Sequence, residues 1–251
     1  MTVGVQRVAY SRLPILKRLI PSLRKRRAWF TAPESYRLVK REGVVFLANY
    51  AGWADKMAVI HGLAEYEQLH FLLREIGERQ CNVFLDIGAH MGTYAIMVAH
   101  KTRCQRIVAF EPDPRNYAHL QANLLVNGLI DVIESKPVAV SDLDGSVSFV
   151  LGPATHDVWS RVADDTESTL RVPAARLDSI VECRAQSIAL KIDIEGHELR
   201  ALTGMQGLLA NNRCFMQVEC FDDKLPAFQA AMARLGYRLT HAIGPDRYFT
   251  N

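Results

Sequence analysis

The stretch that decides the fold is Phe84-Leu85-Asp86-Ile87-Gly88-Ala89-His90-Met91-Gly92, which runs on into Thr93-Tyr94-Ala95. Its first half is an apolar run that suits a buried strand, its glycines suit a tight turn, and its end suits the first turn of a helix. Such a turn lets a ligand approach the backbone, and the helix N-terminus offers free N–H groups to an anion. The stretch therefore predicts a site for a pyrophosphate or an amino-acid carboxylate.

The glycine spacing separates the ligand classes. A dinucleotide-binding turn needs glycines at 88, 90 and 93, but the chain has Gly88, His90 and Thr93 there. A phosphate loop would end in Gly-Lys-Ser/Thr, which is absent. The pattern Asp86-x-Gly88-x-x-x-Gly92 instead resembles the loop with which class I methyltransferases hold S-adenosylmethionine. An ordinary strand-to-helix turn is the alternative interpretation.

Short apolar runs alternate with helical patterns from residue 82 onward, which is typical of a parallel sheet covered by helices. The runs are 82–87, 106–110, 135–140, 188–192 and 215–219. Because they are apolar without alternation, we expect strands buried on both faces. The pattern predicts an α/β fold with helices on both sides of the sheet.

Turn and capping residues place the remaining elements. A helix is expected between the N-cap Asp113 and the terminator Asn127-Gly128. A second helix is expected after Gly196, with one apolar face made of Leu199, Leu202, Met205 and Leu209. Segments 146–151 and 168–173 alternate like antiparallel strands flanking a flap, and 237–243 with 247–250 predict a closing antiparallel hairpin.

Polar residues follow the expected strands, and ligands of open α/β sheets bind outside the carboxyl ends of the strands. Glu111, followed by Pro112, lies 19 residues after Gly92, where a carboxylate can accept both ribose hydroxyls of an adenosine. Ser141 and Asp142 follow the next run and are expected near the adenine. The alternatives are a helix cap for Glu111 and a turn cap for the pair.

With the run Lys191-Ile192-Asp193-Ile194-Glu195-Gly196, the sequence over about 82–220 resembles the FkbM-type methyltransferase family. The other matching pieces are 86–92, Phe110-Glu111-Pro112, Val140-Ser141-Asp142, Leu177-Asp178-Ser179-Ile180 and Val218-Glu219. His90 departs from the asparagine that the family usually has there. The resemblance implies a Rossmann-like, seven-stranded, mostly parallel sheet, S-adenosylmethionine as methyl donor, and O-methylation of a sugar, glycan or natural-product hydroxyl.

Methyl transfer to an alcohol requires removal of the hydroxyl proton, by a general base or by a metal that lowers the hydroxyl pKa. Asp193, Glu195 and His197 are the candidate catalytic residues: Asp193 or His197 as base, with Glu195 orienting substrate or cofactor. Alternatively, the two acids bind the loop and the cofactor amino group, and His197 is a first-turn helix residue. Lys191 is expected to pair with an acid. Mg²⁺ is conceivable on these residues but is not favoured, and no metal site is predicted.

Residues 1–41 carry eleven Lys or Arg and one acid, a net +10, whereas the other 210 residues carry −7. We expect 1–80 to be a basic helical extension and lid, and 81–251 to be the catalytic domain. The basic segment could lie on an anionic membrane or attract a lipid-linked acceptor, but packing on the domain or a second subunit is favoured. The lid residues Tyr50, Trp53 and Lys56, and His156 and Trp159 of the flap, are candidate acceptor contacts.

Several function classes are disfavoured by the sequence. Five scattered cysteines without CxxC spacing indicate free thiols in a reducing compartment, and no apolar run is long enough for a membrane span. We therefore expect a cytoplasmic protein, peripheral to the inner membrane face at most. A base-methylating motif and an RNA-binding module are absent, so a small-molecule, glycan or glycolipid acceptor is expected rather than nucleic acid. Nucleic-acid methylation and non-catalytic binding of S-adenosylmethionine are the alternatives, and a homo-oligomer is possible.

Overall fold

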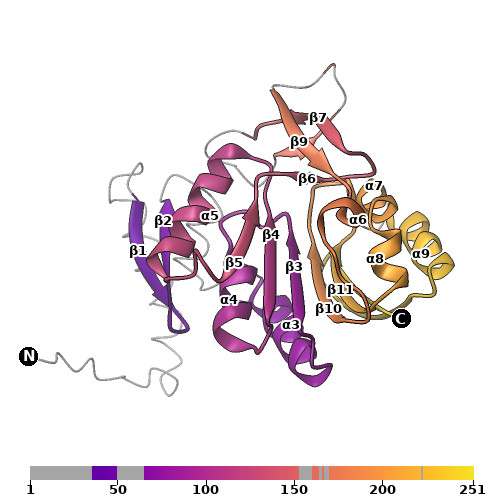
Figure 1. Cartoon of the computed structure of the whole chain (residues 1–251), viewed down its shortest axis with the longest axis horizontal. Coiled ribbons are helices and arrows are strands. Elements are labelled where there is room, and N and C mark those ends of the chain that lie inside the picture. The colour runs from indigo at the N-terminus through magenta and orange to yellow at the C-terminus, as the bar shows by residue number, and fades with distance from the viewer. Residues whose placement is uncertain (1–35, 50–64, 153–159, 164–165, 167–169, 222) are drawn as a thin grey trace, which may run out of the picture.

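The central element of the computed structural model is a seven-stranded sheet with the order β12-β13-β11-β10-β3-β4-β5 (Figure 1). The structure describes residues 36–49, 65–152, 160–163, 166, 170–221 and 223–251. The strands of this sheet are β3 (Val83–Ile87), β4 (Arg106–Phe110), β5 (Ile133–Lys136), β10 (Ser187–Ile192), β11 (Arg213–Glu219), β12 (Arg238–Ile243) and β13 (Asp246–Thr250). All neighbours are parallel except the two pairs made by β13. The predicted Rossmann-like sheet with its closing hairpin is confirmed.

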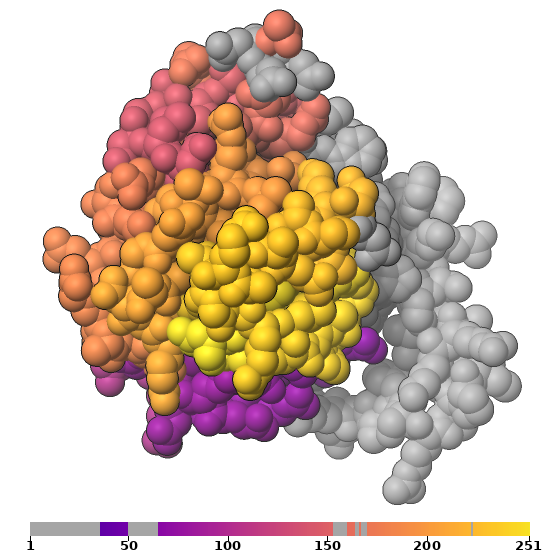
Figure 2. All heavy atoms as spheres, turned by 90° about the vertical axis from the view of Figure 1, so that its right-hand side faces the viewer, coloured from indigo at the N-terminus to yellow at the C-terminus, as the bar shows by residue number. Residues whose placement is uncertain are grey.

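Helices cover both faces of the sheet and create two core layers. One layer packs α3 (Tyr66–Glu78), α4 (Thr93–Lys101) and α5 (Pro114–Val126) on the sheet. The other packs α6 (Leu177–Ile180), α7 (Glu198–Thr203), α8 (Gln206–Ala210) and α9 (Leu225–Arg234). Figure 2 shows the C-terminal part, in yellow, at the centre of the surface formed by this second side. Every residue of β3 is buried, as expected for a strand covered on both faces.

A second, four-stranded sheet has the order β6-β9-β7-β8. Its strands are β6 (Ala139–Val140), β7 (Gly145–Val150), β8 (Arg161–Val162) and β9 (Leu170–Ala175). The antiparallel β7–β9 pair was expected, but the prediction of one strand over 135–140 is wrong. Pro137 has no N–H to donate, so the run splits into β5 in the main sheet and β6 in the small one.

The single helix predicted after Gly196 is also corrected. The chain forms two short helices, α7 and α8, interrupted at Gly204. A Cβ at Gly204 would lie 1.9 Å from the carbonyl oxygen of Ser141, so this glycine permits close packing against the segment after β6. Leu199 was expected on the apolar face but is exposed.

The described part of the N-terminal extension begins with a β-hairpin that the sequence did not predict, and the expected helical segments within residues 1–35 lie outside the described residues. It consists of β1 (Tyr36–Arg41) and β2 (Val44–Asn49), and alternate residues of β2 are buried. Polar side chains of α5 hydrogen-bond the backbone of β2. Asn127 accepts from the Val45 N–H at 3.0 Å, Asn123 accepts from the Leu47 N–H at 2.7 Å, and His119 contacts the Leu47 carbonyl. Within the described residues, no helix is long and apolar enough to cross a membrane.

Candidate active site

The turn after β3 is held by backbone contacts that only glycine permits. Gly88 has φ +82°, and a Cβ there would lie 1.8 Å from the carbonyl oxygen of Asp193. The N–H groups of Gly88 and Ala89 donate to the carbonyl of Phe110 at 3.0 and 2.9 Å. Gly92, also left-handed, is the N-cap of α4. The turn therefore lies directly against the loop that follows β10.

Asp86 stabilises this turn from the interior of the fold. Its Oδ2 accepts the Ala95 N–H of α4 at 3.0 Å, and its Oδ1 is buried without a hydrogen-bond partner in the described part of the chain. Burial raises the pKa of Asp86 to about 6, although the ammonium of Lys191 opposes the rise. Asp86 is 1% exposed, so it acts on the turn and on Lys191 from inside the fold.

Glu111 connects the turn to the next strand. Its carboxylate accepts the N–H of His90 at 2.8 Å and the N–H of Asp113 at 2.9 Å. Burial raises the pKa of Glu111 to about 7. His90 itself has φ +50°, which the bond to Glu111 stabilises. Both carboxylate oxygens keep a second lone pair that a ribose hydroxyl could use, so the backbone contacts and the ribose hypothesis are compatible.

A small apolar pocket lies between the carboxyl ends of β3 and β4 and the small sheet. Its cavity volume is only about 20 Å³. The lining consists of Ile87, Gly88, Phe110, Pro112, Val138, Ala139, Val140, Val162, Ile194 and His197. The flat faces of an adenine ring match this apolar lining, and the ribose attached to the ring would lie toward Glu111. The apolar lining suits the faces of an adenine ring, but the cavity is smaller than an adenosine, so side chains around it must move for the ring to enter.

Ser141 and His197 form the polar border of this pocket. The two buried side chains are 2.9 Å apart between Oγ and Nε2, and Ser141 Oγ donates to Asp142 at 3.0 Å. Burial lowers the pKa of His197, and Arg200 lowers it further. The imidazole is therefore neutral at pH 7 and lies on the pocket side of the loop.

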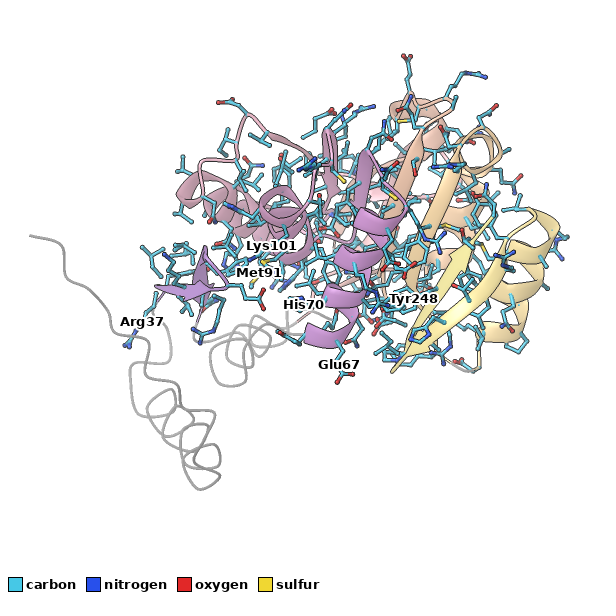
Figure 3. All side chains as sticks on the ribbon, turned by 90° about the horizontal axis from the view of Figure 1, so that it is seen from below. Arg37, Glu67, His70, Met91, Lys101 and Tyr248 are labelled. Carbon is cyan, nitrogen blue, oxygen red and sulfur yellow. The ribbon has the colours of Figure 1, made fainter. Side chains whose placement is uncertain are left out.

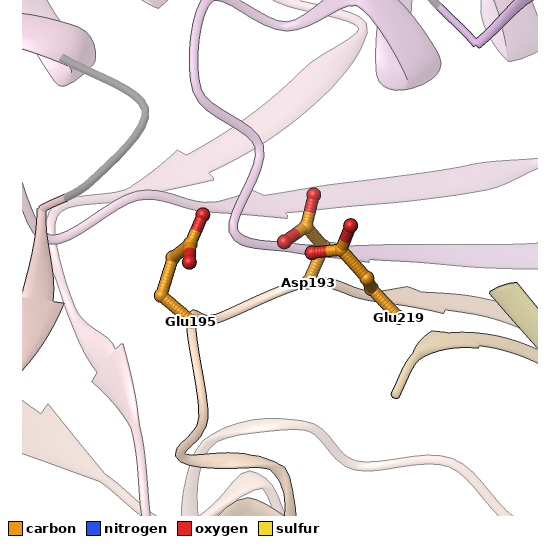
Figure 4. A group of neighbouring side chains, drawn as sticks. All are labelled: Asp193, Glu195 and Glu219. Carbon is orange, nitrogen blue, oxygen red and sulfur yellow. The ribbon is translucent and has the colours of Figure 1, made fainter. Parts of the chain in front are cut away.

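Three carboxylates meet at the ends of β10 and β11. One oxygen from each of Asp193, Glu195 and Glu219 lies within 4.8 Å of the others (Figure 4). Glu195 has φ +53°, a strained conformation that occurs preferentially at functional sites. The arrangement can take up a proton from an acceptor, and its oxygen atoms are also ligands that a divalent cation accepts.

The three carboxylates have different proton affinities. Burial alone would raise the pKa of Asp193. The Lys191 ammonium and a hydrogen bond from Glu219 outweigh this effect, so the pKa of Asp193 is lowered overall. Burial, with the neighbouring Asp193, raises the pKa of Glu219 to about 9. Burial also raises the pKa of Glu195 to about 7. At neutral pH the cluster therefore contains an ionised Asp193, a protonated Glu219, and a Glu195 poised between the two states.

A polar row crosses four strands beneath this cluster. Asp86, Lys191, Gln217 and Tyr248 are register partners on adjacent strands. Gln217 Nε2 donates to Tyr94 of α4 at 2.9 Å and to Asp246 at 2.8 Å. Figure 3 shows Tyr248 beside α3, on the side of the sheet that α3 covers. This face of the sheet therefore carries a row of polar side chains next to the candidate active site.

The structure brings together most residues that the sequence singled out. Gly88, Ala89, His90, Glu111 and Pro112 surround the turn and pocket, Ser141 and His197 border them, and Asp193 and Glu195 lie across the Gly88 turn. Tyr50, Trp53, Lys56, His156 and Trp159 lie outside the described residues. The roles assigned to all of these residues stay predictions.

Sequence reasoning gave no role to Glu219, Glu198 or Gln217. Glu219 was noted only as part of a matching motif, although its place at the end of a strand was a usable signal. Glu198 lies in the first turn of α7, and its Oε1 accepts the Gly196 N–H at 2.8 Å, which stabilises the loop after β10. Gln217 gave no signal, because a polar residue in an apolar run has no partner visible in the sequence.

A known protein family and a curated relative match this chain. The model of the family described as methyltransferase FkbM domain matches residues 86–239. Hexuronic acid methyltransferase AglP of Haloferax volcanii is 28% identical over 147 residues, 58% of this chain and 58% of the relative. The match thus spans little more than half of that relative's length.

Solved structures also match. One is a methyltransferase FkbM from Methylobacillus flagellatus KT, 18% identical with a TM-score of 0.48, covering 68% of this chain and 44% of that one. Another is TYW2 of M. jannaschii in complex with AdoMet, 12% identical with a TM-score of 0.44, covering 88% and 86%.

Proposed function

Because the chain belongs to the family of the methyltransferase FkbM domain, we propose that it methylates a hydroxyl of a sugar, glycan or natural product. As a member of that family it is an S-adenosylmethionine-dependent methyltransferase, and the acceptor is the proposed part. The carboxylate cluster at the ends of β10 and β11, directly beside the Gly88 turn, carries the proposal. The hexuronic acid named for the relative supports a sugar acceptor.

The chain's residues divide the work of the reaction. Gly88, Glu111 and the apolar pocket bind the adenosine part of the cofactor and fix its position. S-adenosylmethionine supplies an activated methyl group on a sulfonium. Asp193 or Glu195 takes the proton from the acceptor hydroxyl, and such a base contributes roughly 10²–10⁴ in rate. Glu195 is suited to this step because its pKa of about 7 lies near the working pH.

Two variants test the base. We expect Asp193→Ala to lose most turnover, because it removes the carboxylate that Lys191 holds at the cluster. Glu195→Ala should also lose most turnover, because Glu195 is the other candidate base. His197→Ala serves as a comparison and should retain more turnover, since the imidazole bonds Ser141 at the pocket. Turnover is measured by mass spectrometry, and calorimetric binding of S-adenosylhomocysteine serves as the control for the cofactor site. Unchanged turnover in both carboxylate variants contradicts the assignment of the base.

The acceptor class is tested by a methyl-transfer screen. The panel contains a hexuronic acid glycoside, a neutral hexose glycoside, a phenolic natural product and a structured RNA. We expect a glycoside or natural product to be methylated and the RNA to be inert. Methylation of RNA alone contradicts the proposal, and tight cofactor binding without transfer to any acceptor identifies a non-catalytic binder.

We expect transfer to proceed without added metal. The Lys191 ammonium lies 2.9 Å from Asp193 Oδ2, and the proton on Glu219 further reduces the negative charge of the cluster. Both features therefore offset the negative charge that a bound cation would otherwise neutralise. Dialysis against EDTA should leave turnover within about twofold. Loss of activity that Mg²⁺ restores contradicts this expectation and makes the cluster a cation site.

A further inference from the structure

We propose that Lys191 is a positioning residue that holds the Gly88 turn and the Asp193 carboxylate in one fixed arrangement. The inference rests on the proposed function, since Asp193 is a candidate base of that reaction. Lys191 is not among the described residues that line the apolar pocket, and it acts through the groups it binds.

The burial of Lys191 is the first observation. The residue is 5% exposed and stands one residue before the end of β10, a strand whose other residues are apolar or small. A buried ammonium is costly unless it is paired and hydrogen-bonded. A lysine at this position is therefore explained by the partners that it reaches, because an apolar side chain would fill the same space at no such cost.

The partners are the second observation. Nζ donates to Asp193 Oδ2 at 2.9 Å and to the carbonyl oxygen of Gly88 at 3.3 Å, and it lies 5.2 Å from the centre of the Tyr94 ring. One ammonium thus joins the turn after β3 to the loop after β10 while an aromatic face covers it.

The fit between the two loops makes this link consequential. The Gly88 position leaves no room for a Cβ against the Asp193 carbonyl, and the Asp193 N–H donates to the Ile87 carbonyl at 3.0 Å. The backbones are therefore fixed to each other, and the Lys191 ammonium adds an ion pair and hydrogen bond to the Asp193 side chain. Without the ammonium, the Asp193 carboxylate keeps its hydrogen bond with Glu219 but loses the contact that aligns it with the Gly88 turn.

The surroundings of Lys191 are otherwise acidic. The ionisable groups that face it are Asp86 on β3, Glu65 before α3, Tyr94 on α4, Glu195 in the same loop, Glu219 on β11 and Asp246 on β13. A neutral side chain at position 191 would leave the ionised carboxylates of this group to repel Asp193, with the protonated Glu219 as its remaining side-chain partner.

The test compares Lys191→Met and Lys191→Arg with the matched control Lys136→Met, whose half-buried side chain on β5 pairs with Glu134 and not with the carboxylate cluster. We expect Lys191→Met to lower kcat by about 100-fold, because a displacement of about 1 Å can cost that much. The KM for the best acceptor of the screen should change by less than threefold. Lys191→Arg keeps the positive charge, so its kcat should be at least tenfold higher than that of Lys191→Met. Lys136→Met should have the kcat of the wild type.

A second readout does not depend on activity. Amide hydrogen exchange of the unliganded protein should be faster over residues 84–92 and 193–197 in Lys191→Met, and S-adenosylhomocysteine should bind several-fold more weakly. Lys191→Gln, which keeps a donor without a charge, replaces the methionine variant if that one does not fold. Wild-type kcat together with wild-type exchange in a folded neutral variant overturns the proposal.

These readouts separate the two proposals. If the wild type methylates nothing in the screen, the proposed function fails, and hydrogen exchange and cofactor binding still decide the role of Lys191. Faster exchange then supports the positioning role, and unchanged exchange contradicts it.

Discussion

Gly88 is the residue at which space is most limiting. Alanine there would place a Cβ 1.8 Å from the Asp193 carbonyl oxygen, whereas Gly128, also with positive φ, has nothing within 4 Å of such an atom. Gly128→Ala should cost only the left-handed penalty, roughly 1–2 kcal/mol. Gly88→Ala should cost clearly more and abolish S-adenosylhomocysteine binding. Urea unfolding and calorimetry measure both, and equal losses in the two variants contradict the collision.

Glu111 predicts a pH dependence of stability. Its pKa rises from 4.5 to about 7 on folding because the carboxyl is buried, so the folded state binds the proton more tightly than the unfolded state. The free energy of unfolding should therefore fall by about 3 kcal/mol as pH rises from 4.5 through 7. In Glu111→Gln the fall should be smaller by this amount, because Asp86, Glu195 and Glu219 still titrate in the same direction, and S-adenosylhomocysteine should bind more weakly.

The matched control is Glu134→Gln, which removes an exposed glutamate paired with Arg106. Its pKa is lowered by the Arg106 hydrogen bond, so its contribution has the opposite sign and is small at the surface. Urea unfolding at pH 5 and pH 8 checks both variants. An identical pH dependence in Glu111→Gln and the wild type rules out the buried carboxyl as the cause.

At single residues the sequence predicted positions better than contacts. The glycine spacing and the strand ends placed Gly88, Glu111 and Asp193 at one edge, because parallel strands bring their carboxyl ends together. The sequence did not indicate the hydrogen bond between Glu219 and Asp193, because this contact depends on the side-by-side packing of β10 and β11. Pairing between strands far apart in the chain leaves no local pattern.

Among the elements, α5 has a double role that its amphipathic pattern does not reveal. Asn123 is fully buried, accepts the Leu47 N–H of β2 and donates to the Met91 carbonyl at 2.9 Å. Asn123→Ala leaves two buried backbone groups unpaired, and we expect a loss of roughly 2–4 kcal/mol. Leu125→Ala, on the exposed face of the same helix, should stay within about 0.5 kcal/mol. Thermal unfolding distinguishes the two, and a small effect at Asn123 contradicts its linking role.

The elements that the sequence missed have a common physical cause. The hairpin β1–β2 pairs its edge with side chains of α5 instead of a third strand, and hydrogen bonds to a distant helix cannot be inferred from periodicity. The break at Pro137 was visible in the sequence, but the destination of β6 depended on β9, more than thirty residues later. Strands and helices with strong local signals, such as β3 and α5, were placed within one or two residues.

For the whole molecule, the charge is unevenly distributed. Residues 1–41 carry +10 and the remainder −7, and residues 1–35 lie outside the described residues. We expect the basic segment to pack on protein, so deletion of 1–27 should leave co-sedimentation with anionic vesicles unchanged. Stronger sedimentation of the full chain than of the deletion variant supports membrane attraction instead.

The position of β13 between β11 and β12 affects how the chain folds during synthesis. Residues between Glu219 and Asp246 must emerge before β13 can pair with β11, which takes a few seconds at ~5–20 residues per second. Until then the edge of β11, with Phe215, Met216 and Val218, is unpaired. An open apolar edge strand can join another chain, so we expect association between newly made molecules to be strongest at this stage and to end once β13 pairs with β11.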